Sequence, residues 1–144
     1  MKVLFVCTGN ICRSPMAEVI FANILKKKNK RNIKVASAGT MTMNGLPMTE
    51  TAREALNVCG EKIGRRIMKS TKWNRDMLNE YDHIVTMTQG HADHIGEHPN
   101  VYTLSSVTQG EDIFDPFMQS LDVYVQVCKI LQEELKILYG RIVR

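Results

Sequence analysis

The sequence has no apolar run close to the eighteen or so residues that a membrane-spanning helix needs. At its start, Met1-Lys2 and the short apolar run 3–6 do not match an export signal. Neither a paired metal-ligand motif nor a secreted disulfide framework is formed by its four cysteines, Cys7, Cys12, Cys59 and Cys128. We therefore expect a cytoplasmic protein with no membrane association and no metal site.

Aromatic residues are also scarce, at 6%, and 19 basic against 15 acidic residues leave a mild net charge of +4. Nucleic-acid binding calls for a broader basic surface with interleaved aromatics, so it is not expected. The one dense basic run, 26–31, suits the C-terminus of a helix, where cations complement the helix dipole. The segment of His91, His94 and His98 contains Gly96 and is flanked by Gly90 and Pro99, which favours a solvated surface over a metal site.

Short apolar runs alternate with helical patterns along the whole chain. The runs predict strands at 2–6, 33–37, 83–87 and 101–103, and the 3.6-residue periodicity predicts helices at 16–28, 49–58, 74–80, 92–96 and 120–139. Such alternation is typical of an α/β fold whose parallel sheet is covered on both faces. The length fits one domain, residues 1–144.

The segment 7–15 joins the first predicted strand to the first predicted helix and has the makings of an anion-binding loop. Backbone N–H groups of a short loop containing Gly9 point inward, and the helix N-terminus adds partial positive charge. Arg13 can close a planar fork over two anion oxygens. This field favours the thiolate of Cys7, and a thiolate beneath a phosphoryl group can attack phosphorus. Pro15 suits the first helical position, where no N–H is needed.

Four stretches carry a resemblance to the low-molecular-weight protein-tyrosine phosphatase family. The most specific is Cys7-Thr8-Gly9-Asn10-Ile11-Cys12-Arg13-Ser14-Pro15-Met16-Ala17-Glu18, which is similar to the family signature. The others are Ser37-Ala38-Gly39-Thr40, Tyr81-Asp82-His83-Ile84-Val85-Thr86-Met87 and Asp112-Ile113-Phe114-Asp115-Pro116-Phe117. The resemblance implies a flavodoxin-like, three-layer domain with a four-stranded parallel sheet, a site at the carboxyl ends of the strands and no cofactor.

The resemblance also implies roles for individual residues. Cys7 would be the nucleophile, Arg13 the phosphoryl-binding cation and Asp115 the acid that protonates the leaving group and later activates water. The phosphate-binding loop would comprise Thr8, Gly9, Asn10, Ile11, Cys12 and Ser14.

Three further expectations concern the surroundings of the Cys7 thiol. Ser14 is expected to donate to the Cys7 sulfur or to cap the helix. Asn10 tolerates a left-handed backbone, and the resemblance makes Ser37 its hydrogen-bond partner. Cys12 would either form a reversible disulfide with Cys7 under oxidation or pack beneath the loop. The chain departs from the common pattern at Thr88, where an Asp usually stands, and in 64–70, which lacks the histidine of many members.

The resemblance implies a phosphorylated protein as substrate and inorganic phosphate as product, and we expect a monomer. The rim residues bear on which phosphorylated residue is bound. Met41 on one side and Phe117 and Met118 on the other would flank the loop. Ile11 gives an apolar rim that suits the phenyl ring of phosphotyrosine. The alternative is a protein-arginine phosphatase, because Asp115-Pro116-Phe117 and Met87-Thr88 resemble that bacterial branch, although it carries a Thr in place of Ile11.

Two other readings are less well supported. Arsenate reduction on this scaffold needs relay cysteines after the third strand, and residues 86–99 contain none. A non-catalytic phosphopeptide-binding module would need neither a thiol nor an acid. The joint presence of Cys7, Arg13 and Asp115 therefore favours an enzyme.

Overall fold

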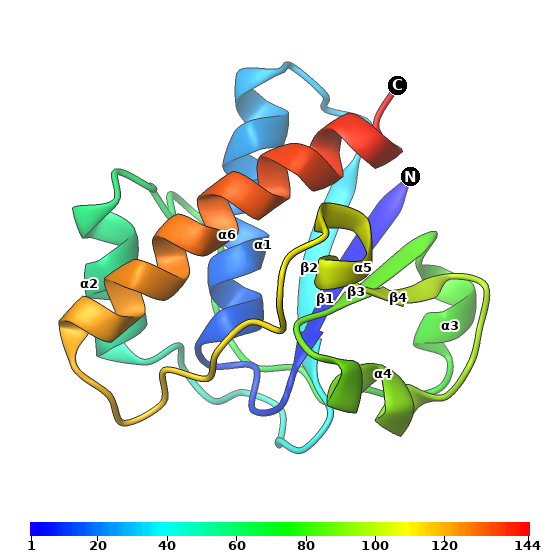
Figure 1. The fold of residues 1–144 in the computed structure, drawn as a ribbon, viewed down its shortest axis with the longest axis horizontal. Coiled ribbons are helices and arrows are strands. Elements are labelled where there is room, and N and C mark those ends of the chain that lie inside the picture. Colours follow the sequence, from blue (N-terminus) through cyan, green and yellow to red (C-terminus); the bar gives the residue numbers. More distant parts are fainter.

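The computed structural model describes residues 1–144 and contains one parallel sheet of four strands in the order β2-β1-β3-β4 (Figure 1). The strands are β1 (Lys2–Cys7), β2 (Lys34–Gly39), β3 (His83–Thr86) and β4 (Val101–Thr103). β1 pairs with β2 from Lys2↔Lys34 to Cys7↔Gly39 and with β3 on its other side. The predicted flavodoxin-like parallel sheet is confirmed.

Helices cover both faces of this sheet, as Figure 1 shows. One face carries α1 (Arg13–Lys27), α2 (Glu50–Val58), α5 (Leu104–Thr108) and α6 (Leu121–Ile142), and the other carries α3 (Met77–Glu80) and α4 (Gln89–Ile95). No helix combines the length and the apolarity that crossing a bilayer requires.

The alternation of side chains along β1 explains the two cores. Val3 and Phe5 belong to the large cluster under α1 and α6, whereas Leu4 and Val6 belong to the smaller cluster under α3 and α4. All four side chains are at most 1% exposed. A central strand buried on both faces reads as a continuous apolar run, which is why β1 could be located from sequence. The loop that follows it is thereby held against both layers.

Several element boundaries differ from those that the sequence predicts. α1 begins at Arg13, so Pro15 is the third helical residue rather than the first. It is tolerated because N–H groups of the first turn have no intrahelical partner in any case. α4 begins at Gln89 under a Thr88 cap, three residues earlier than predicted. The short helix α5 was not predicted.

Candidate active site

The Cys7 thiol lies at the carboxyl end of β1 and is 2% exposed. The Ser14 hydroxyl oxygen is 2.9 Å from its sulfur, and the Asn10 backbone N–H donates to it over 3.3 Å. Ser14 is the second residue of α1 and does not cap it, so the capping alternative is wrong and the contact with Cys7 is observed. The Ser14 hydroxyl is also 3.4 Å from the Ala38 carbonyl oxygen, and its one proton can turn to the sulfur when Cys7 is a thiolate, beside the N–H of Asn10.

Asn10 holds the loop in the predicted left-handed conformation, with φ of 57°. Its side-chain N–H group donates to Ser14 Oγ over 2.7 Å, and its side-chain oxygen accepts from the Thr71 backbone N–H at 2.8 Å. The predicted bond to Ser37 is wrong. Ser37 lies beside Phe5 in the parallel register, on the face covered by α1, and donates to Glu18 at 2.7 Å.

Gly39 shows why the end of β2 carries a glycine next to the loop. A Cβ on Gly39 would lie 2.6 Å from the Thr8 carbonyl oxygen and 3.0 Å from Asn10 Cβ. No side chain fits there without displacing backbone. The motif that includes Ser37 therefore supports the loop through the close approach of Gly39 rather than through the Ser37 hydroxyl.

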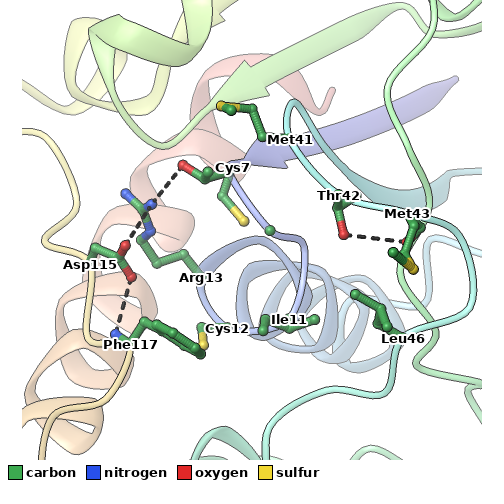
Figure 2. A pocket seen from close by; sticks show the side chains of 12 residues that line it. Cys7, Ile11, Cys12, Arg13, Met41, Thr42, Met43, Leu46, Asp115 and Phe117 are labelled. Carbon is green, nitrogen blue, oxygen red and sulfur yellow. Dashed lines mark hydrogen bonds and ion pairs between the residues drawn. The ribbon is translucent and has the colours of Figure 1, made fainter.

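The Arg13 guanidinium is 5% exposed and reaches under the loop from the first turn of α1. It donates through Nη1 to the Ile113 carbonyl at 3.1 Å and through Nη2 to Thr8 Oγ1 at 3.3 Å. Nη2 also lies 3.6 Å from a carboxylate oxygen of Asp115. Figure 2 shows this pairing beside the Cys7 side chain. Cys7 and Arg13, near the start of the chain, thus meet Asp115, more than 100 positions later, in one cavity.

Asp115 lies on a loop whose preceding residues are anchored to the end of β3 and to the start of α4. The Ile113 N–H donates to the Met87 carbonyl at the end of β3, and Asp112 accepts from the Gln89 N–H at the start of α4. The Asp115 carboxylate accepts from the Phe117 N–H at 3.1 Å, while its side chain remains 54% exposed. A carboxyl held at the mouth of a cleft can exchange protons both with a leaving group and with water.

Cys12 occupies the same loop as Cys7 but has a different environment. Its sulfur lies 3.3 Å from the Tyr124 hydroxyl of α6 and 3.6 Å from Thr49 Oγ1, the cap of α2. Burial raises the pKa of the Cys12 thiol above its ordinary value, against the lowering effect of its hydrogen bonds to Tyr124 and Thr49. Both cysteines are free thiols. The packing beneath the loop is thus observed, and the disulfide remains a prediction.

His91 is a contact of the loop that the sequence did not reveal. It is 6% exposed, and its Nε2 lies 2.8 Å from Thr8 Oγ1, so the predicted solvated position is wrong for this histidine. Burial, and secondly the Arg13 charge, lower its pKa to about 4. A signal was present in the sequence: Thr88 followed three residues later by a hydrogen-bonding side chain has the spacing of a capping box. The structure has that box.

A cavity of about 470 Å³ opens above the Cys7 thiol. Its lining consists of Cys7, Thr8, Gly9, Ile11, Cys12, Arg13, Met41, Thr42, Met43, Leu46, Asp115 and Phe117. Figure 2 shows Asp115 and Phe117 on one side and Met43 and Leu46 on the other. Met118, predicted as part of the rim, is not in the lining and is 85% exposed. No group of three or more His, Cys, Asp or Glu side chains is arranged to hold a metal ion.

The family model for low molecular weight phosphotyrosine protein phosphatase matches residues 2–144. The chain belongs to this family. A protein-arginine-phosphatase of Bacillus subtilis is 35% identical over 143 residues, covering 94% of this chain and 93% of that protein. The low molecular weight protein-tyrosine-phosphatase PtpB of Staphylococcus epidermidis is 36% identical over 131 residues, or 88% of each chain.

Solved structures of a tyrosine phosphatase and of an arginine phosphatase both superpose closely on this chain. A low molecular weight protein tyrosine phosphatase from T. tengcongensis superposes with a TM-score of 0.88 at 30% identity, covering 99% of each chain. A variant of the YwlE arginine phosphatase with a phosphorylated active-site serine superposes with a TM-score of 0.87 at 33% identity, covering 99% of this chain and 95% of that one. The fold and the family are therefore shared by phosphatases named for two different phosphorylated residues.

Proposed function

We propose that this chain removes phosphate from phosphotyrosine in proteins through a cysteinyl-phosphate intermediate. The observation that carries the proposal is the convergence of the Cys7 thiol, the Arg13 guanidinium and the Asp115 carboxyl on one cavity. A non-catalytic phosphopeptide-binding module would need the Arg13 guanidinium but neither the Cys7 thiol nor the Asp115 carboxyl. The phosphorylated active-site serine of the YwlE variant supports a phosphoryl-enzyme step in a relative of this chain.

The residues suit two successive displacements at phosphorus. The Cys7 thiolate attacks, the bond between phosphorus and the leaving oxygen breaks, and Asp115 gives its proton to that oxygen. Water then attacks the phosphocysteine, Asp115 takes the water proton, and the S–P bond breaks to restore the thiolate and release inorganic phosphate. Arg13 offsets the charge on the phosphoryl oxygens in both steps.

The walls of the cavity favour a phenyl ring. Five of the twelve lining residues, Ile11, Met41, Met43, Leu46 and Phe117, present large apolar side chains. A guanidinium carried by phosphoarginine would need an acceptor, and Asp115 is the only carboxylate in the lining. Because that carboxylate already lies 3.6 Å from Arg13, its charge is partly offset.

The alternative is a protein-arginine phosphatase with the same mechanism. It is favoured by the length of the match to the Bacillus subtilis relative. The decisive experiment measures kcat/KM on a matched pair of phosphotyrosine and phosphoarginine peptides, with Cys7→Ser as the blank. A tyrosine preference above tenfold supports the proposal. An arginine preference replaces it with the alternative, and turnover of neither peptide rejects both.

The proposed setting follows from the chemistry of the thiol. A catalytic thiolate must stay reduced, so we place the enzyme in the cytoplasm, acting as one domain of residues 1–144 and as a monomer. Cys12 would protect Cys7 by forming a reversible disulfide with it under oxidation. The substrates are then phosphorylated proteins and the product is inorganic phosphate.

A further inference from the structure

Thr8 and His91 form a hydrogen-bonded pair that the two displacement steps above do not use. Thr8 follows Cys7 directly and lines the same cavity. His91 comes from the first turn of α4, on the opposite side of the sheet from α1, and contacts Thr8 across 83 positions of sequence.

The hydrogen bonds of His91 determine where its proton lies. The Thr88 backbone N–H can only donate, and it points at His91 Nδ1 over 3.2 Å. Nδ1 must therefore be an acceptor, and the proton of the neutral ring lies on Nε2. Nε2 then donates to Thr8 Oγ1 over 2.8 Å. The pKa lowered to about 4, by burial and by Arg13 against the opposing charges of Asp112 and Asp115, keeps the ring neutral near pH 7.

Thr8 Oγ1 accepts a second hydrogen bond, because Arg13 Nη2 donates to it at 3.3 Å and a guanidinium can only donate. A hydroxyl has two acceptor lone pairs and one proton. With both lone pairs engaged by His91 and Arg13, the Thr8 proton is the one group left to donate. No other protein atom is hydrogen-bonded to the Thr8 hydroxyl. Thr8 and Arg13 both line the cavity.

We propose that the Thr8 hydroxyl donates a hydrogen bond to the phosphoryl group of the substrate and that His91 is the positioning residue that fixes this direction. The inference rests on the proposed phosphatase function and adds one donor to it. A donor aimed at the phosphoryl oxygens strengthens as charge develops in the transition state, so its loss lowers kcat more than it raises KM. Polarisation by two N–H donors strengthens the O–H group further.

Two pairs of matched variants separate this role from a structural one. Thr8→Val removes the hydroxyl at nearly constant shape, and Thr8→Ser keeps it. His91→Asn keeps an acceptor near the Nδ1 position for Thr88 but is too short to donate to Thr8. His91→Gln extends an amide N–H toward Thr8 but loses the acceptor that completes the cap of α4. The control is His94→Asn, on the exposed side of the same helix.

We expect Thr8→Val and His91→Asn each to lower kcat on a phosphotyrosine peptide about tenfold, the size of one hydrogen bond to a charged group, with little change in KM. The double variant should be no slower than either single one, because both remove the same donor. Thr8→Ser and His91→Gln should keep kcat within about threefold, while His91→Gln lowers Tm. His94→Asn should change neither quantity.

The inference is overturned if Thr8→Val keeps wild-type kcat, if the two losses multiply, or if kcat follows Tm across the His91 variants. Calorimetric binding of inorganic phosphate provides a readout that does not need turnover, and Thr8→Val should bind it about two- to threefold more weakly than Thr8→Ser, because the donor bonds less strongly in the ground state than in the transition state. A wild-type protein that binds phosphate but turns over no phosphopeptide rejects the proposed function, and the phosphate affinities still decide the role of Thr8. Equal phosphate affinities in Thr8→Val and Thr8→Ser overturn the proposed role of the Thr8 hydroxyl.

Discussion

The floor and the rim of the cavity are built in different ways. The floor residues Cys7, Arg13 and Ser14 are at most 5% exposed, and hydrogen bonds to neighbouring loops and strands fix them. The rim residues Met41 and Phe117 are 73% and 48% exposed. Buried, fully paired polar groups set charge and geometry, whereas exposed side chains can be exchanged with little effect on stability. We infer that the floor performs the chemistry and the rim selects the substrate.

The largest expected effect comes from removing Cys7, the proposed nucleophile. Cys7→Ser should lower kcat by more than about 10⁴-fold, since a serine hydroxyl in this position has no base to activate it. Binding of inorganic phosphate should persist, because Arg13 and the loop N–H groups remain. Steady-state kinetics and calorimetry measure the two properties. Appreciable turnover by the variant would remove Cys7 as the nucleophile.

The second effect concerns Asp115, which belongs to the rim by exposure and to the floor by its contact with Arg13. Asp115→Asn should lower kcat about 10²-fold or more on phosphotyrosine, and less on aryl phosphates whose leaving groups need no proton. A series of aryl phosphates of graded leaving-group pKa measures the difference. Equal losses across the series would contradict the acid role.

The third prediction compares the two thiols of the floor. Peroxide should inactivate the wild-type enzyme, and a thiol reductant should restore most of its activity if Cys12 traps the oxidised Cys7 as a disulfide. Cys12→Ser should then recover little, because Cys7 proceeds to irreversible oxidation. Cys128→Ser is the matched control, since that cysteine lies on the buried face of α6 and does not line the cavity. Equal recovery in Cys12→Ser and the wild type would refute the protective disulfide.

The fourth prediction tests whether His91, in the first turn of α4, is a buried neutral ring in the folded protein. The pKa of His91 is lowered from 6.5 to about 4 in the fold, so the unfolded chain binds a proton that the folded chain excludes. The stability that the neutral His91 ring contributes to the fold is complete above pH 6.5 and is lost as the pH falls toward 4. Between pH 7 and pH 4.5, the wild type should lose about 2 kcal/mol more unfolding free energy than His91→Asn. Urea titrations of both proteins at the two pH values measure this, and parallel losses would contradict the buried neutral ring.

The smallest effects are expected at the rim. Ile11→Thr should shift the ratio of kcat/KM for phosphotyrosine over phosphoarginine by about five- to tenfold toward arginine, because a hydroxyl replaces apolar surface beside the leaving group. Met41→Ala should raise KM about threefold with kcat unchanged. Thermal melts should move little in either variant. A large loss of kcat on both peptides would place Ile11 with the floor instead.

The parts of the molecule that could be predicted from sequence are those in which neighbouring residues decide the structure. The apolar run of β1, the loop from Cys7 to Ser14 and the helix that follows are contiguous, so the strand, the left-handed turn and the presence of the helix, though not its first residue, could be derived locally. The position of Asp115 came from the resemblance to the family. The flavodoxin-like parallel sheet came from the same resemblance, and the structure gives its strand order as β2-β1-β3-β4.

The parts that could not be predicted depend on contacts between distant segments. The backbone N–H that orients Asn10 belongs to Thr71, 61 positions away in an irregular segment. The direction of the Ser37 side chain depends on the register of β2 against β1, and one residue decides which face it points to. His91 resembled a surface residue because its partner lies 83 positions away. Met118, whose backbone adopts a left-handed φ of 63°, is 85% exposed and does not line the cavity.

The most direct test of the central claim is to capture the phosphoryl-enzyme. Asp115→Asn, in which hydrolysis of the intermediate should be slowed, is mixed with an aryl phosphate whose leaving group needs no proton, quenched within milliseconds and digested for mass spectrometry. We predict one phosphoryl group on the Cys7 sulfur, absent when Cys7→Ala is combined with Asp115→Asn. Phosphate on any other side chain, or none on a protein that turns the substrate over, would contradict a floor built around Cys7.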